Sequence, residues 1–202
     1  MSYPVPETPL ESLYEIKKSK FLARAGYAGT REEAMAFLDQ VKQDYPDARH
    51  HCWAYILGNP RSPSSVAMSD DGEPGGTAGK PILNVLQHKD VGDIMMVVTR
   101  YFGGIKLGAG GLVRAYSASA QQTMEQLATV EQISLTPTQV TCDFKYEQLI
   151  RLWVDEHQGV ISDVNYSQEV DIHLMLPEEH LIALEEFLAG LGAKIAKESP
   201  VS

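Results

Sequence analysis

The chain has 202 residues, 44% of them hydrophobic, and a formal net charge of −10 at neutral pH. This length suits one large domain or two small ones, and the acidic balance argues against polyanion binding by the whole surface. No apolar run approaches the length of a membrane span, and the N-terminus lacks a signal-peptide pattern. We therefore expect a cytoplasmic protein with no membrane partner, in which Cys52 and Cys142 are buried thiols of a reducing compartment.

The first part of the chain is expected to mix strands and helices. Thr30, with Glu33 three residues later, predicts a capping box at the start of a helix that stops before Pro46. The predicted elements in chain order are a loose start (1–10), a strand (13–25), this helix, a strand (50–57), a long loop (58–81), a helix from Ile82, a central buried strand (93–102) and a helix after a second glycine loop. The buried face of that last helix is expected to hold Leu112, Tyr116, Ala120, Met124 and Leu127.

The last part follows a different order. Strands are predicted at 139–143, 160–166, 169–176 and 194–197, and helices at 146–156 and 178–188. Leu149, Leu152 and Trp153 are expected to face inward. The order βαββαβ is that of the ferredoxin-like unit. We therefore expect two domains, 1–133 and 134–202, joined by a linker near 133–137.

The net charge is divided unevenly between these two parts. Residues 134–202 carry 4 Lys+Arg and 12 Asp+Glu, whereas residues 1–133 carry 13 and 15. Any contact with nucleic acid is therefore expected in a local basic patch of the first part, and the acidic second part is a possible site for a protein partner.

Ten of the sixteen glycines fall between Gly72 and Gly111. A nucleotide-binding P-loop is excluded, because Pro74 and Pro81 stand where its first glycine and its magnesium-binding hydroxyl belong. The dinucleotide fingerprint also fails, since Val113 fills its third glycine position. Glycines that only allow two loops to pack closely, beside solvated arginines, are the simpler alternative.

Both glycine loops are expected to end at helix starts, where free N–H groups favour anions. Thr77 is the expected cap of the first helix, and Lys80 lies beside it. Residues 99–116 contain three cations and no acid, with Tyr101, Phe102 and Tyr116 interleaved, which suits phosphate contacts and base stacking. Tyr101 is the expected base-stacking residue. The candidate binding residues are Asp70, Asp71, Glu73, Gly76, Thr77, Gly79, Lys80, Arg100, Tyr101, Gly103, Gly104, Lys106, Gly108, Gly110 and Arg114. Lys17, Lys18 and Lys20 are expected to extend the patch if their strand lies alongside.

Metal and catalytic alternatives were weighed against the same residues. Asp70, Asp71 and Glu73 are candidates for a hard cation or a general base, although acids before a helix more often serve as turn and cap residues. His50 and Cys52 share one face of a strand but lack the partners of a zinc site, and Cys52 is a weak candidate for a nucleophile. No cofactor, resident metal or catalytic residue is therefore assigned.

Four sequence blocks resemble the signature of the IMPACT/YigZ family, in the family's order: EIKKSKF at Glu15–Phe21, ARHHCWAY at Ala48–Tyr55, SDDGEPGGTAGKP at Ser69–Pro81 and RYFGGIKLGAGGLVRAY at Arg100–Tyr116. The resemblance implies an α+β protein. Its first domain would be a two-layer β-α-β domain like that of a small-subunit ribosomal protein and the fourth domain of elongation factor G. Its second, ferredoxin-like domain would resemble the fifth domain of that factor.

The resemblance also implies a function in translation. The family's eukaryotic relative regulates translation through the kinase that senses amino-acid starvation. The leading hypothesis is a non-enzymatic protein that contacts RNA or the ribosome through its glycine-rich basic surface. The alternatives are an enzyme acting on a small phosphorylated or anionic substrate, and a module that binds only protein.

Overall fold

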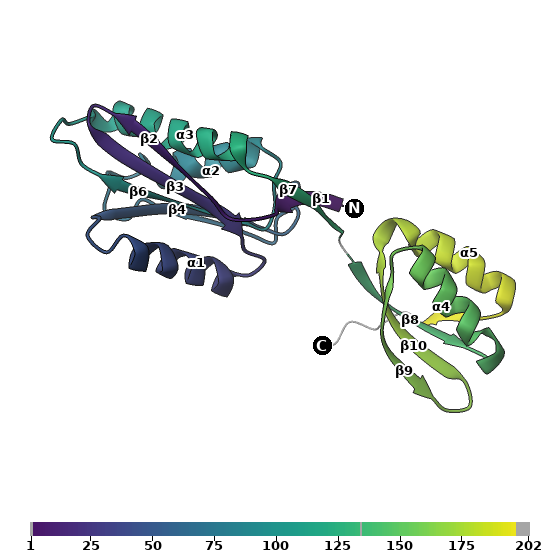
Figure 1. Cartoon of the computed structure of the whole chain (residues 1–202). Helices are drawn as coiled ribbons and strands as arrows, with labels where there is room; N and C mark the ends of the chain where they lie inside the picture. The colour runs from purple at the N-terminus through teal and green to yellow at the C-terminus, as the bar shows by residue number, and fades with distance from the viewer. Residues whose placement is uncertain (1, 134, 197–202) are drawn as a thin grey trace. The chain divides into compact units, whose positions relative to one another are not determined.

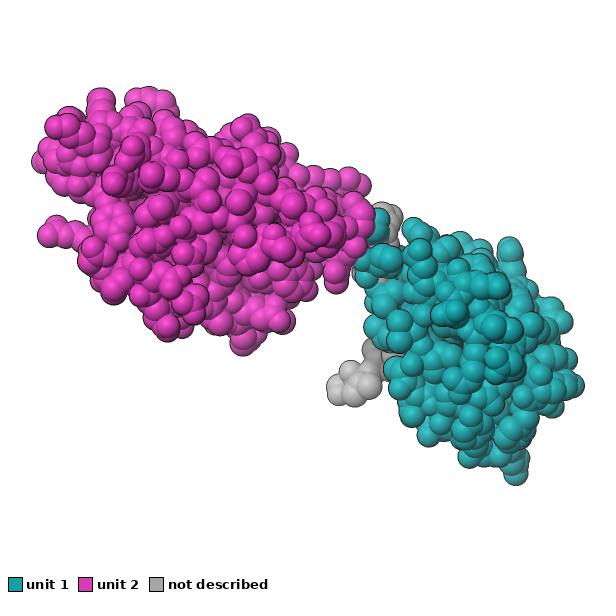
Figure 2. Space-filling view, viewed as in Figure 1, with its two compact units in different colours: residues 1–2, 133–202 teal, residues 3–132 magenta. Residues whose placement is uncertain are grey.

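The computed structural model describes residues 2–133 and 135–196 and contains two compact units (Figures 1 and 2). One unit spans Tyr3–Gln132 and the other begins at Ile133. Position 134 of the expected linker and Lys197 of the expected last strand lie outside the described residues. Within the described ranges, no helix is both long enough and apolar enough to cross a membrane.

The first unit is built on a five-stranded antiparallel sheet with the order β2-β3-β6-β4-β5. The central position of β6 confirms the prediction from its apolar run. A separate pair of strands joins β1 to β7. The elements are β1 (Ser2–Pro6), β2 (Leu10–Ile16), β3 (Ser19–Tyr27), α1 (Arg31–Asp44), β4 (His50–Leu57), β5 (Ser65–Ser69), α2 (Gly79–His88), β6 (Ile94–Tyr101), α3 (Gly108–Gln126) and β7 (Thr129–Ile133).

Helices cover both faces of this sheet (Figure 1). Neighbouring residues of a strand point to opposite faces, so Cys52, Ala54 and Ile56 pack in one core with α2 and α3. Tyr55 and Leu57 pack in a second core with α1. The unit therefore has three layers where two were expected, because the buried stripe of α1 covers the second face.

Two other expectations for this unit were wrong. The single strand expected over residues 13–25 is a hairpin of β2 and β3, which turns at Lys17 and Lys18 with φ of 46° and 64°. The first ten residues, expected to be loose, contain β1. The capping prediction is confirmed in part: the Glu33 N–H donates to Thr30 Oγ1, but the Glu33 carboxylate accepts from Gly29 instead of Thr30.

The second unit has the sheet order β11-β8-β10-β9 and the predicted βαββαβ order, which confirms the α+β class and the two-domain architecture. Its elements are β8 (Leu135–Cys142), α4 (Glu147–Glu156), β9 (Val160–Tyr166), β10 (Val170–Pro177), α5 (Leu181–Leu191) and β11 (Lys194–Ala196), with short 3-10 turns at Phe144–Tyr146 and Glu178–His180. The expected inward face of α4 is confirmed for Trp153, which packs against the core, but it was wrong for Leu149 and Leu152, which are exposed, whereas Ile150 and Val154 are buried. The two fully buried residues, Ile150 and Val154, are four residues apart, so they lie on one face of the helix.

Candidate functional site

The first glycine loop ends at α2, and a carboxylate of the loop itself accepts hydrogen bonds from backbone N–H groups at the start of that helix. One carboxylate oxygen of Asp70 accepts from the N–H of Gly76 at 2.8 Å, and the other accepts from Ala78 and Gly79 at 3.0 and 2.8 Å. Burial tends to raise the pKa of Asp70, but the three N–H donors outweigh it and lower the pKa below its ordinary value. Asp70, and not Thr77 as expected, therefore caps α2, and Thr77 donates to the Pro74 carbonyl instead.

The other two acids of this loop also have protein partners. Asp71 accepts from the backbone N–H of His51 at 2.7 Å, and its carbonyl oxygen contacts Nδ1 of His50. Glu73 is buried and turns toward α3 and β6. Among residues 2–133 and 135–196, no group of three His, Cys, Asp or Glu side chains is arranged to hold a metal ion.

Glu73 joins the two glycine loops through a buried polar network. Its Oε1 atom accepts from Arg100 Nη1 at 2.6 Å and from the Tyr116 hydroxyl at 2.8 Å. The Cys52 sulfur lies 3.3 Å from that hydroxyl and 3.0 Å from the Asp70 carbonyl. Burial raises the pKa of Cys52 to about 12. The thiol is therefore protonated at neutral pH and unsuited to the nucleophilic role considered above.

The second glycine loop leads into α3 without a comparable cap. The N-cap position is Leu107, no described side chain accepts from the first N–H groups, and the first turn contains no acid. The first N–H groups of a helix have no partner within the helix and carry partial positive charge. The start of α3 therefore offers the donors that Asp70 occupies at α2.

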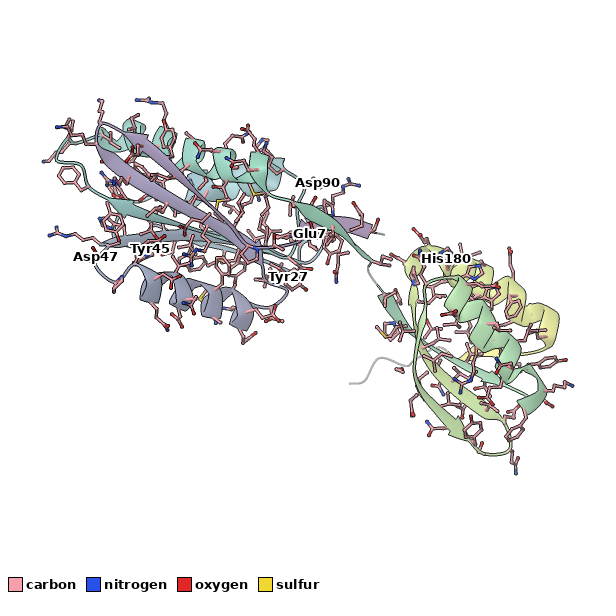
Figure 3. The ribbon with its side chains drawn as sticks, in the orientation of Figure 1. Glu7, Tyr27, Tyr45, Asp47, Asp90 and His180 are labelled. Atoms are coloured by element: carbon pink, nitrogen blue, oxygen red, sulfur yellow. The ribbon has the colours of Figure 1, made fainter. Side chains whose placement is uncertain are left out.

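A pocket of about 650 Å³ opens at the start of α3, where β6 ends and β4 begins. Its lining residues are Asp47, Arg49, His50, Glu73, Pro74, Arg100, Tyr101, Phe102, Lys106, Leu107, Gly108, Ala109 and Leu112. The labels of Tyr45 and Asp47 mark this end of the unit in Figure 3. The lining contains three cationic side chains, Arg49, Arg100 and Lys106, and two carboxylates. Both carboxylates, of Asp47 and Glu73, accept hydrogen bonds from protein donors.

Arg100 is the cation most firmly held in this pocket. The residue is 8% exposed, and Glu73 is the only described residue that accepts a hydrogen bond from its guanidinium. Its Nε atom is buried and has no hydrogen-bond partner among the described residues. A buried donor without a partner is uncommon and calls for a specific explanation.

Tyr101 and Phe102 line the same pocket differently. The Tyr101 hydroxyl donates to Asp47 at 2.7 Å, and burial together with this bond raises its pKa to about 12. Its ring also lies edge to face with Tyr45. The Phe102 side chain has no group that could form a comparable hydrogen bond, and the residue is 58% exposed. Phe102 is therefore the more exposed of these two aromatic rings, and the stacking role expected of Tyr101 stays a prediction.

The tip of the β2–β3 hairpin lies against the second glycine loop. The Gly103 N–H donates to Ser19 Oγ at 3.1 Å, and a Cβ added at Gly103 would lie 2.0 Å from the backbone of Lys18. Lys20 pairs with Tyr101 across β3 and β6. The lysines at 17, 18 and 20 therefore lie alongside the loop that leads into α3, which was the condition for them to extend the basic surface.

The structure thus divides the expected site residues into groups. Five of them line the pocket: Glu73, Arg100, Tyr101, Lys106 and Gly108. Gly103 and Gly104 belong to the loop beside it, and Asp70, Asp71, Gly76, Thr77 and Gly79 build the first loop. Lys80, Gly110 and Arg114 do not line the pocket. Phe102, one of the interleaved aromatic residues noted in the sequence, also lines the pocket, whereas sequence reasoning missed Asp47 and Arg49.

Family comparisons match both units. The Impact N-terminal domain matches residues 17–124, and a domain of unknown function (DUF1949) matches residues 140–192. IMPACT family members of Haemophilus influenzae and Escherichia coli, the latter YigZ, are each 40% identical to this chain. They cover 86% and 87% of it, and 84% and 86% of their own lengths.

One solved structure shares the fold over nearly the whole chain. A crystal structure of a hypothetical protein superposes with a TM-score of 0.78 at 35% identity, over 99% of this chain and 98% of its own. Yih1, described as a two-domain translational regulator, matches 61% of this chain and 46% of its own at 24% identity. Its TM-score of 0.35 is too low to support a structural argument. On the domain match and the similarity to curated relatives, the chain belongs to the IMPACT family.

Proposed function

We propose that this protein is a non-enzymatic binding protein that contacts RNA, alone or within the ribosome, through the pocket at the start of α3. The observation that carries the proposal is the convergence of Arg49, Arg100 and Lys106 on a helix start that no described side chain caps. Backbone N–H groups and the positive end of a helix favour phosphate. Arginine adds a planar set of donors that suits phosphate oxygens.

The setting in translation is part of the proposal and rests on the family. The resemblance carried by the four sequence blocks implies a function in translation. Fold likeness alone does not establish function, so the proposal depends on the chemistry of the pocket. A protein partner for the acidic second unit is a separate hypothesis, and pull-down with each unit would test it.

We do not favour the enzymatic alternative. It required Asp70, Asp71 and Glu73 to hold a cation or accept a proton, and each of these carboxylates instead accepts hydrogen bonds from protein donors. The alternative therefore lacks a specific observation in its favour.

The proposal is tested by measuring RNA affinity at about 50 and 200 mM salt, because phosphate contacts make affinity fall steeply with salt. Lys106→Ala and Arg49→Ala are expected to weaken binding and to flatten the salt dependence. Lys80→Ala is the matched control, since Lys80 lies in the first turn of α2, where Asp70 accepts from the N–H of Gly79, and does not line the pocket. Absent binding, or affinity that does not change with salt, would contradict the proposal.

A further inference from the structure

Phe102 is an exposed aromatic residue on the rim of a charged pocket. More than half of its surface is open to solvent, and Ile105 in the same loop is also exposed. A single exposed hydrophobic residue is ordinary on a protein surface. Phe102 is distinguished by its neighbours, because it lines the same pocket as Arg100, Lys106 and the first residue of α3.

The position of the ring is fixed from two sides. The guanidinium carbon of Arg100 lies 5.7 Å from the centre of the Phe102 ring and 5.6 Å from that of the buried Phe21. Cations over aromatic faces at such distances attract them. The next residue, Gly103, is held against the β2–β3 hairpin by its bond to Ser19. Phe102 thus lies between Tyr101, the last residue of β6, and Gly103, which has no space for a side chain. Both neighbours limit the movement of its backbone.

Phosphate donors and an exposed aromatic face in one pocket match the two parts of a nucleotide. The cations and the start of α3 suit the phosphate, and aromatic faces stack with any base. A base can reach such a face only when it is unstacked and unpaired, as in single strands, loops and bulges. A duplex covers its base faces and would leave Phe102 without a partner.

We infer that the pocket binds single-stranded RNA and that Phe102 stacks on one of its bases. This inference rests on the proposed function and adds the class of RNA and the residue that selects it. The same chemistry disfavours a purely apolar protein partner, which would leave the buried Nε of Arg100 and the N–H groups of α3 without acceptors.

The test compares an unstructured RNA oligonucleotide with a duplex of equal length, using fluorescence anisotropy and the full chain at low salt. We expect tighter binding of the single strand and an affinity loss of about tenfold for Phe102→Ala, from the usual energy of base stacking. Phe102→Leu should lose nearly as much, because it retains an apolar side chain but has no aromatic face, whereas Phe102→Trp should bind at least as well as the wild type. Phe144→Ala is the matched control, since Phe144 is 51% exposed in the other unit.

The outcomes separate this inference from the proposed function. Binding of neither RNA would contradict the proposed function and this inference together. Equal binding of single strand and duplex, with no loss in Phe102→Ala, would leave RNA binding in place and overturn the stacking role. Wild-type affinity in Phe102→Leu would also overturn it, because an apolar contact would then suffice. A fluorescent base analogue in the single strand should be quenched by the wild type and not by Phe102→Ala.

Discussion

The two glycine-rich loops of the first unit each lead into a helix, yet their helix starts differ in what accepts from the N–H groups. At α2 the carboxylate of Asp70 accepts from Gly79, the first helical residue, from Ala78 at the N-cap and from Gly76 in the loop before it. At α3 no described side chain accepts from the first N–H groups, and the helix start faces a pocket with three cations. A high density of glycines therefore marks places where the backbone lies close to neighbouring segments. Whether the N–H groups at a helix start are free for a ligand depends on whether a nearby carboxylate already accepts from them.

The largest expected effect concerns Glu73, which connects the two loops. Glu73→Gln leaves the buried Arg100 without its carboxylate, and breaking a buried ion pair in this way typically costs about 3 to 5 kcal/mol. The free energy of unfolding, measured in urea, should fall by about 3 kcal/mol. Glu15→Gln is the control, because its 3.8 Å pair with Lys20 is exposed and such pairs are worth less than about 1 kcal/mol.

The next effect tests the role of Asp70. Asp70→Ala removes the acceptor of three N–H groups and should lower the free energy of unfolding by about 2 kcal/mol, as for a strong helix cap. The folded-state pKa of Asp70 is lowered from 3.8, so its contribution is present above that pH and is lost as the pH falls through the lowered value. The difference between wild type and variant should therefore shrink as the pH falls below 3.8. A comparable loss in Asp39→Ala, an exposed carboxylate of α1, would contradict this explanation.

A smaller effect follows from His51, which donates its backbone N–H to Asp71 and packs its ring beside Thr99. Burial lowers the pKa of His51 below its ordinary 6.5. The unfolded chain therefore takes up a proton before the folded one, and stability should be lost as the pH falls below about 6.5. Melting temperatures between pH 8 and 5 should decline less steeply in His51→Asn. His88→Asn, at an exposed position of α2, should melt with the wild-type pH dependence.

The smallest effect on stability, but a large one on binding, is expected at Ala109. Ala109→Asp places a carboxylate in the first turn of α3 and should stabilise the fold by about 0.5 kcal/mol, while it abolishes RNA binding by occupying the helix start. Lys80→Asp is the counterpart at the second position of α2, where Asp70 already fills this role. It should bind RNA like the wild type although it changes the net charge by more. Loss of binding in both variants would show that total charge, and not the start of α3, controls affinity.

The parts of the fold that the sequence predicted depend on local patterns. The buried strand β6 has a continuous apolar run, and β4 was predicted with its observed bounds. The turn at Lys17 and Lys18 was missed because residues with positive φ are usually glycine, asparagine or aspartate. The strand β1 was missed because its partner β7 is more than 120 residues away in the sequence. A local sequence pattern carries no information about such a distant pairing.

The candidate site was predicted in part for the same reason. Cations and glycines near the start of α3 are adjacent in sequence, so Arg100, Lys106 and Gly108 were named together. Arg49 and Asp47 reach the pocket from the start of β4, through strand pairing that the sequence does not encode locally. Thr77 was wrongly predicted as the cap because the usual capping rule examines only the residue next to the helix, whereas Asp70 caps α2 from several residues upstream.

The pairing of β1 with β7 has a consequence for the order of synthesis. The segment Ser2–Pro6 leaves the ribosome long before its partner Thr129–Ile133, which is the last strand of the unit to be made. Distant pairings of this kind form late, because a long loop must close before they contribute. While the rest of the unit is being made, the first strand therefore has its backbone groups open to chaperones or to neighbouring chains. The unit is completed only when synthesis of the second unit begins.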